Sequence, residues 1–115
     1  TRKMKDEIVK RTKIEIQVGL DENHVPVELR WHSDDTDEGG KCKAAMLAIW
    51  DEEEENTMRI DLWEKEMNVY DMQRFFHQSL LTMADTYERA TSQSAPAKEL
   101  REFAENFAKT TGLKD

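Results

Sequence analysis

The hydrophobic period of the chain changes once, after Trp63, and this change constrains the fold more than any other feature of the sequence. Before it, apolar residues occupy every second position, a period that is typical of half-buried strands. After it, apolar residues recur every three or four positions, as on one face of an amphipathic helix. This helical stripe comprises Val69, Met72, Phe76, Leu80, Met83 and Tyr87. Strands followed by helices predict an α+β fold.

The alternating part divides into four predicted strands, at residues 12–20, 25–32, 42–50 and 57–63. Short polar segments separate them, which favours one four-stranded antiparallel meander sheet. Pro26 has no N–H group, so we expect an edge or a bulge where the second strand begins. Ser33 to Gly40 is predicted to be a loop. The segment 42–50 is apolar at both parities, which indicates a central strand covered on both faces.

Two helices are expected to follow the sheet. Asn68 is the predicted N-cap of a long helix that runs to about Ala90 and lies across one face of the sheet. Residues 91–95 form a linker, and Pro96 suits the first turn of a second, C-terminal helix that ends at Gly112. The apolar stripe of the second helix comprises Leu100, Phe103, Ala104, Phe107 and Thr111.

Charge divides the chain unevenly and restricts its partners. The 115 residues carry 25 acidic and 17 basic side chains, a net charge of −8. We expect residues 1–11 to form a flexible basic arm and residues 12–115 to form a single domain. The acidic domain disfavours nucleic acid and anionic membrane surfaces as partners. No run of about 18 apolar residues occurs, so no direct membrane insertion is expected.

The N-terminal residues and the single cysteine indicate a cytoplasmic protein. The first 13 residues lack the apolar stretch of a secretory signal. Cys42 cannot form an internal disulfide and fits a reducing compartment. Thr1 is not a start methionine, so we expect a piece of the natural chain upstream of it.

Candidate catalytic and metal-binding residues do not form a recognisable motif. Cys42 shares no pattern with His24, His32 or His77, so a buried thiol is favoured over a Cys–His nucleophile. The consecutive carboxylates of 51–55 point in different directions and lack the spacing of a calcium site. The acidic residues from Asp34 resemble half of a calcium loop, but Ala45 occupies the position of the bidentate glutamate. We therefore predict no enzyme, no cofactor and no metal.

Exposed apolar side chains are the strongest candidates for a functional surface. Trp63 has the parity of Arg59 and Asp61, so it lies on the opposite side of its strand from Met58, Ile60 and Leu62. An aromatic side chain there is a good anchor for a protein partner. The candidate interface residues are Trp63, Arg59, Trp50, Phe75 and Leu81.

Extended segments of the sequence resemble one known family. Lys41–Asp51, Asn56–Trp63, Met72–Thr91 and the opening Ile14–Trp31 are similar to the gliding motility protein GldC family of Bacteroidetes. The resemblance covers about residues 12–112. It implies a small soluble accessory protein linked to gliding motility, and the family has no established catalytic residues to transfer.

Three classes of function follow from these patterns. The first is a non-enzymatic protein–protein interaction module whose partners are components of the gliding machinery or, as a homodimer, a second copy of the chain. The alternative is a single-stranded nucleic-acid binder, because four strands followed by a long helix are similar to Pur-alpha and Whirly folds, with Arg30, Arg59 and Lys43 supplying charge. An enzyme or small-molecule carrier would need a deep pocket, which no spacing predicts.

Overall fold

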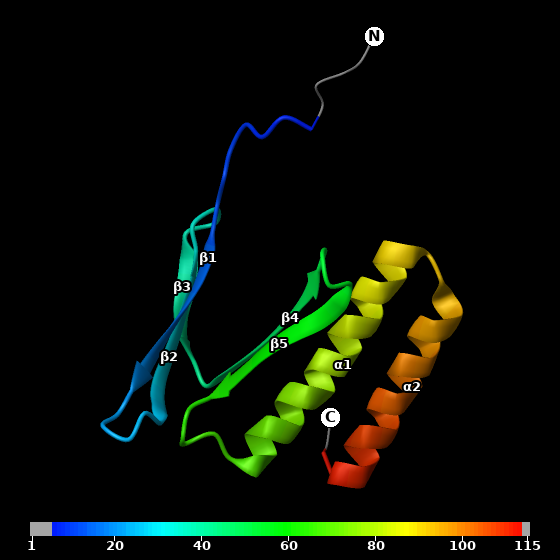
Figure 1. Ribbon diagram of the computed structural model, residues 1–115. Coiled ribbons are helices and arrows are strands. Elements are labelled where there is room, and N and C mark those ends of the chain that lie inside the picture. Colours follow the sequence, from blue (N-terminus) through cyan, green and yellow to red (C-terminus); the bar gives the residue numbers. More distant parts are fainter. Residues whose placement is uncertain (1–5, 114–115) are drawn as a thin grey trace. The chain divides into compact units, whose positions relative to one another are not determined.

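A computed structural model describes residues 6–113, and these fall into two compact units that divide between Met67 and Asn68 (Figure 1). The first unit contains only strands and the second only helices. Each is described by itself. The predicted single domain over residues 12–115 stays a prediction, as does the predicted position of the long helix across the sheet.

The first unit contains two antiparallel sheets. Its five strands are β1 (Ile14–Leu20), β2 (Pro26–Ser33), β3 (Glu38–Cys42), β4 (Ala44–Asp51) and β5 (Asn56–Trp63). The first three form one sheet in the order β1-β2-β3, and β4 pairs with β5 in a separate two-stranded ribbon. The α+β class with antiparallel strands is confirmed, but the prediction of one four-stranded meander is wrong.

The error comes from β3, which was predicted to be a loop. The chain turns tightly over 34–37, and Glu38 to Cys42 then pair with β2. A Cβ atom on Gly39 would collide with the carbonyl oxygen of Trp31 and lie 3.0 Å from the Cα of His32. Glycine at this position therefore allows a strand to approach β2 closely, whereas its composition alone indicates a loop.

The predicted central strand is also divided differently. Cys42 closes β3 opposite Leu29, and β4 begins only at Ala44. Among the residues that the structure describes, β4 has β5 as its single neighbour, so it is not a central strand. A run that is apolar at both parities predicted coverage on two faces, but it cannot show which strands provide the pairing.

The β1–β2 hairpin matches its prediction. The side chain of Asp21 accepts hydrogen bonds from the backbone N–H groups of Val25 and Asn23, which lower the pKa of its carboxyl group. The register shifts between Gly19 and Leu20, opposite Pro26, so the predicted irregularity is confirmed. Leu29 in β2 is the largest fully buried side chain of the described residues.

The second unit is an antiparallel helical hairpin of α1 (Val69–Thr91) and α2 (Ser94–Thr111) (Figure 1). The Asn68 side chain accepts a hydrogen bond from the Asp71 N–H at 2.7 Å, which confirms the predicted N-cap. Gly112 ends α2 in a left-handed conformation, also as predicted. The predicted five-residue linker is wrong, because only Ser92 and Gln93 separate the helices.

Small residues are the fully buried positions of this hairpin: Ala84, Ala97 and Ala104, of which Ala104 was part of a predicted stripe. Ala97 and Ala104 lie one turn on either side of Arg101, whose guanidinium contacts Asp85 and Glu88 of α1. These alanines therefore lie on the face of α2 that packs against α1. The predicted stripes were wrong in detail, since Phe103 is 57% exposed and Met83 is 56% exposed.

Candidate functional site

The β4–β5 ribbon carries three of the five predicted interface residues on one face. Residues directly opposite each other in the register share a face. This aromatic face consists of Ala44, Met46, Ala48 and Trp50 of β4 with Thr57, Arg59, Asp61 and Trp63 of β5. Trp50 and Trp63 lie at opposite ends of it, and both are exposed, at 67% and 54%. The predicted parity of Trp63 is confirmed by this register.

An ion pair occupies the middle of the aromatic face. The guanidinium of Arg59 contacts the carboxylate of Asp61 at 3.0 Å and lies 3.7 Å from the sulfur of Met46. All three side chains are solvent-accessible, so the pair contributes little to stability. Its effect is to fix one positive and one negative group between two indole rings.

The opposite face of the ribbon is aliphatic except at its tip. It consists of Ala45, Leu47 and Ile49 of β4 with Met58, Ile60 and Leu62 of β5, and Asp51 faces Asn56 at the tip. Ile49, Met58 and Ile60 are each more than half exposed. The ribbon therefore exposes large apolar side chains on both faces. This exposure agrees with the surplus apolar surface that the sequence predicts for this part of the chain.

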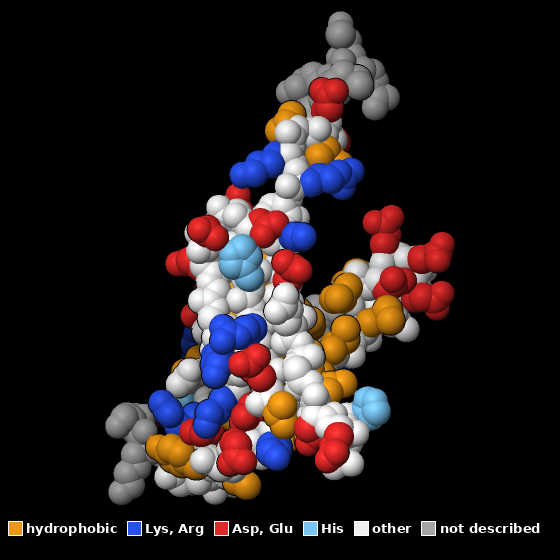
Figure 2. Space-filling model, turned by 90° about the vertical axis from the view of Figure 1, so that its left-hand side faces the viewer, with side chains coloured by type: hydrophobic (Ala, Val, Ile, Leu, Met, Phe, Trp, Pro, Cys, Tyr) orange, Lys and Arg blue, Asp and Glu red, His pale blue; other side chains and the backbone are white. Residues whose placement is uncertain are grey.

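Carboxylates surround the tip of the ribbon. The turn 52–55 is held by Asp51, whose side chain accepts a hydrogen bond from the Glu54 N–H at 2.7 Å. The four glutamates Glu52, Glu53, Glu54 and Glu55 are exposed. Figure 2 shows red acidic side chains gathered at this end, with orange hydrophobic ones next to them. The ribbon thus combines apolar faces with a strongly negative tip.

The other two predicted interface residues, Phe75 and Leu81, lie on α1 in the second unit. Phe75 is partly buried and Leu81 is 37% exposed. Leu81 lies one helical turn before the fully buried Ala84, so it borders the face that packs against α2. The structure therefore brings Trp50, Arg59 and Trp63 together, whereas Phe75 and Leu81 belong to the helical hairpin of the second unit.

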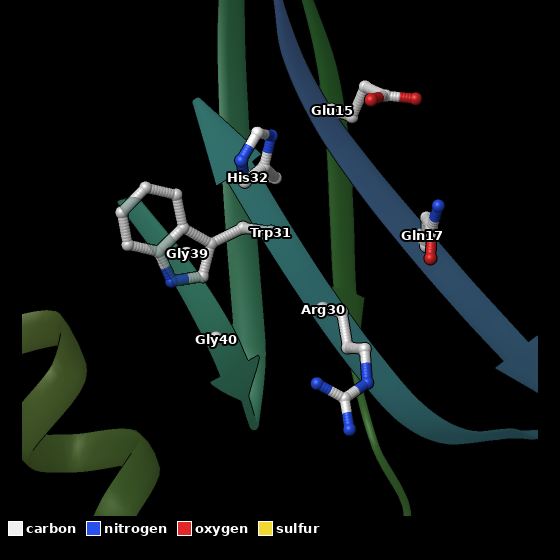
Figure 3. Close-up of a pocket in the computed structure, with 7 residues that line it drawn as sticks. All are labelled: Glu15, Gln17, Arg30, Trp31, His32, Gly39 and Gly40. Carbon is white, nitrogen blue, oxygen red and sulfur yellow. The ribbon is translucent and has the colours of Figure 1, made fainter. Parts of the chain in front are cut away.

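A second group of functional side chains lies on the three-stranded sheet. The alternation of β1, β2 and β3 places Glu15, Gln17, Glu28, Arg30, His32 and Lys41 on one polar face. An open recess of about 380 Å³ lies over this region, and Figure 3 shows Glu15, His32 and Arg30 among the side chains that line it. Figure 2 shows basic and acidic side chains interspersed on the side of the molecule that it presents.

His32 is held between two carboxylates of the β2–β3 turn. Its Nδ1 lies 3.3 Å from Asp34 and its Nε2 lies 3.0 Å from Asp37. Glu15 faces His32 directly from β1. The hydrogen bond to Asp37, followed by the negative charge of Asp34, raises the pKa of His32 above 6.5 despite the opposing effect of burial.

This group was not predicted from the sequence, although part of its signal was present. The predicted alternation already placed Glu15 and His32 on the polar sides of two adjacent strands, but a four-residue turn over 21–24 would pair Glu15 with Arg30, and the register shift opposite Pro26 brings it to His32 instead. Asp34 and Asp37 could not be added, because their position depends on β3, which was predicted to be a loop. Cys42 faces Leu29, on the opposite face of the sheet from His32, so these two side chains do not form a Cys–His pair.

Comparison with known proteins gave a match that covers the chain from β2 to the end of α2. The family model for gliding motility-associated, GldC-like proteins matches residues 26–113. The chain belongs to the GldC-like family. The match confirms the resemblance seen in the sequence, begins at the first residue of β2, and leaves β1 outside. Comparison of this GldC-like chain with curated proteins and with solved structures gave no match.

The family links the chain to gliding motility. Neither helix of the described part of this GldC-like protein has the length and apolar content needed to cross a membrane. The nucleic-acid alternative depended on a single four-stranded sheet, and the division into a three-stranded sheet and a two-stranded ribbon removes that basis.

Proposed function

We propose that this GldC-like chain is a non-enzymatic interaction module of the gliding motility machinery and that the β4–β5 ribbon is its docking surface. The observation that carries the proposal is the exposure of large apolar side chains on both faces of the ribbon. A two-stranded ribbon is only marginally stable in water, so an apolar cover on either face stabilises it. Exposed apolar patches of this kind are typical of protein interaction sites.

The charge of the ribbon indicates the chemistry of the surface that binds it. Asp51 and the four glutamates after it form a negative end beside the apolar faces. The complementary surface is an apolar patch bordered by lysine or arginine side chains, so we infer a protein partner of that chemistry. A second copy of this chain is less suitable, because each copy has a net charge of −8 and would bring a negative end of its own.

The position of the tryptophans supports protein recognition. Binding energy at interfaces is concentrated in a few aromatic and arginine side chains. Trp50, Arg59 and Trp63 share one face of the ribbon, and their spacing along it provides two anchors with a charged pair between them. Each anchor that becomes fully desolvated by a partner contributes about 2 kcal/mol or more.

Site-specific crosslinking in a gliding bacterium tests the proposal. A photoreactive amino acid replaces Thr57, which faces Trp50 on the aromatic face, and in a control chain it replaces the exposed Glu105 of α2. We expect one protein of the gliding machinery to be crosslinked from position 57 and not from position 105. Crosslinks only to another copy of the chain would replace this partner by a homodimer.

Binding of the purified partner that crosslinking identifies then provides the quantitative test. Trp50→Ser should weaken binding by about 2 kcal/mol, which corresponds to a roughly 30-fold higher Kd. Phe103→Ser, which removes an aromatic side chain of α2 that is also more than half exposed, should leave the Kd unchanged. Replacement of Glu52, Glu53 and Glu54 by glutamine should slow association and reduce its dependence on salt.

Two results would reject the proposal. One is equal binding by the Trp50→Ser and Phe103→Ser variants. The other is a loss of several kcal/mol of folding free energy in the isolated Trp50→Ser chain, since a side chain that is free for docking contributes little to the stability of the unbound protein.

A further inference from the structure

The polar face of the three-stranded sheet brings together three side chains that offer ligand atoms to a metal ion. Glu15 of β1, His32 of β2 and Asp34 of the β2–β3 turn each contribute one such atom, and these atoms lie within 4.8 Å of one another. They come from two strands and a turn that the sheet register fixes. We call these three residues the His32 cluster.

We propose that the His32 cluster binds a divalent transition-metal ion of the Zn²⁺ class, with the Nδ1 of His32 and carboxylate oxygens of Glu15 and Asp34 as ligands. This site goes beyond the proposed docking function and lies on a different sheet from the ribbon. Imidazole nitrogen with carboxylate oxygen is a donor set suited to Zn²⁺ and its neighbours rather than to Ca²⁺ or Mg²⁺, which prefer oxygen alone.

The distances within the cluster fit such an ion. Bonds of about 2.0–2.2 Å in a tetrahedron place neighbouring ligand atoms roughly 3.4 Å apart. The Nδ1 of His32 and the nearer oxygen of Asp34 are 3.3 Å apart. The side chains of Glu15, His32 and Asp34 are each more than 40% exposed, so small rotations can bring the third ligand to the same separation.

Asp37 supplies the hydrogen-bond acceptor that the second ring nitrogen of a metal-bound histidine generally has. Its carboxylate contacts the Nε2 of His32 at 3.0 Å, on the opposite side of the ring from Asp34. An Nε2–H donated to Asp37 leaves the Nδ1 lone pair directed toward Asp34. This arrangement fixes the tautomer and orientation of a ligating imidazole, and loss of such a partner generally costs 10- to 100-fold in metal affinity.

The sheet also leaves space above the histidine. Gly39 faces His32 from β3 and has no side chain that could cover the imidazole. The recess of about 380 Å³ beside the cluster is open to solvent, so an ion can enter and retain water at its remaining positions. Figure 3 shows His32 on β2, one of the residues that line this recess, with Glu15 on the neighbouring strand.

One cation already competes for the cluster. The Nζ of Lys13 lies 3.9 Å from the carboxylate of Glu15. A metal ion would have to displace this exposed contact, which is a weak one. Lys13→Gln should therefore tighten metal binding. If Glu15 only formed an ion pair with Lys13 and did not bind the metal, the same substitution would leave the metal affinity unchanged.

Calorimetric titration of the whole chain with Zn²⁺ alone, near neutral pH, tests the proposal. We expect one ion per chain, at least tenfold weaker binding in His32→Gln, and losses of 10- to 100-fold in Asp37→Asn. His24→Gln and Glu28→Gln are the matched controls, since they remove a histidine in the β1–β2 turn and a carboxylate elsewhere on the polar face. Both should bind as the unaltered chain does.

A spectroscopic measurement on the unaltered chain covers the case in which a variant fails to fold. Binding of Zn²⁺ should shift the NMR signal of the His32 Nδ1 nitrogen and leave Nε2 protonated. The absence of binding, equal binding by His32→Gln, or shifts confined to Glu52–Glu55 would each overturn the proposal. None of these outcomes bears on the docking function of the ribbon, which has its own test.

Discussion

Replacement of Gly39 by alanine tests the arrangement of the three-stranded sheet, because β3 can lie against β2 only if this position has no side chain. A Cβ there would meet the carbonyl oxygen of Trp31 and the Cα of His32, both of which are backbone atoms that cannot rotate away. Gly39→Ala must therefore displace β3 at the position that faces His32. Gly19→Ala is the matched control, since its Cβ would meet Glu28 at an ordinary 3.6 Å.

The expected magnitude follows from three contributions. Overpacking of this kind costs about 1–3 kcal/mol. A weakened β2–β3 hydrogen bond adds about 1 kcal/mol. Both are offset by about 0.4–1 kcal/mol, because alanine restricts the unfolded chain more than glycine does. Gly39→Ala should thus lower the free energy of unfolding by about 2 kcal/mol, whereas Gly19→Ala should leave it unchanged or raise it slightly.

Urea titration followed by NMR measures this difference locally. The amide signals of Arg30 and Lys41, which face each other across β2 and β3, report on the pairing itself. In Gly39→Ala these signals should lose their dispersion at lower urea than in Gly19→Ala. Stabilities of the two variants that agree within about 0.5 kcal/mol would show that β3 does not approach β2 as described, and the predicted loop would then be the better description of this segment.

Three further predictions concern the core and the helical hairpin. Leu29→Ala removes the largest fully buried side chain and should cost about 2–5 kcal/mol in urea denaturation, whereas Asn68→Ala removes the cap on the Asp71 N–H and should cost about 1 kcal/mol. The hydrogen bond from Arg101 lowers the pKa of Glu88 in the folded chain below its ordinary value of 4.5. The ionised Glu88 therefore stabilises the folded chain fully above pH 4.5, and this stabilisation is lost as the pH falls through the pKa of Glu88 in the folded state. Acid titration of Glu88→Gln should lack this component, and an unchanged profile would contradict it.

Local patterns in the sequence predicted the elements that depend on neighbouring residues. Asn68, Gly112 and the turn after Asp21 each act within a few positions, and all three were predicted where the structure has them. The alternation at Trp63 likewise placed Trp63 and Arg59 on one side of their strand, because the pleat of a strand has a fixed period. The β4–β5 register adds Trp50 to that face.

Features that depend on distant pairing were not predictable in the same way. Glycine and aspartate in 33–40 indicate a turn whether or not the chain beyond it forms a strand, so β3 and the division into two sheets were missed. The predicted helix stripes included Ala104 but not Ala84 or Ala97, which are buried because they lie where two helices approach closely. The His32 cluster was not predicted because β3 was not predicted, since Asp34 reaches His32 only through the turn into β3.

The distribution of indole rings gives the chain a built-in means of observing its two halves independently. All three tryptophans, Trp31, Trp50 and Trp63, belong to strands of the first unit, while the helices carry none. Intrinsic fluorescence during heating therefore follows the strands, and far-ultraviolet circular dichroism follows chiefly the helices. Coincident curves would mean that residues on both sides of Asn68 melt as one cooperative body, and separated curves would mean that each half melts alone.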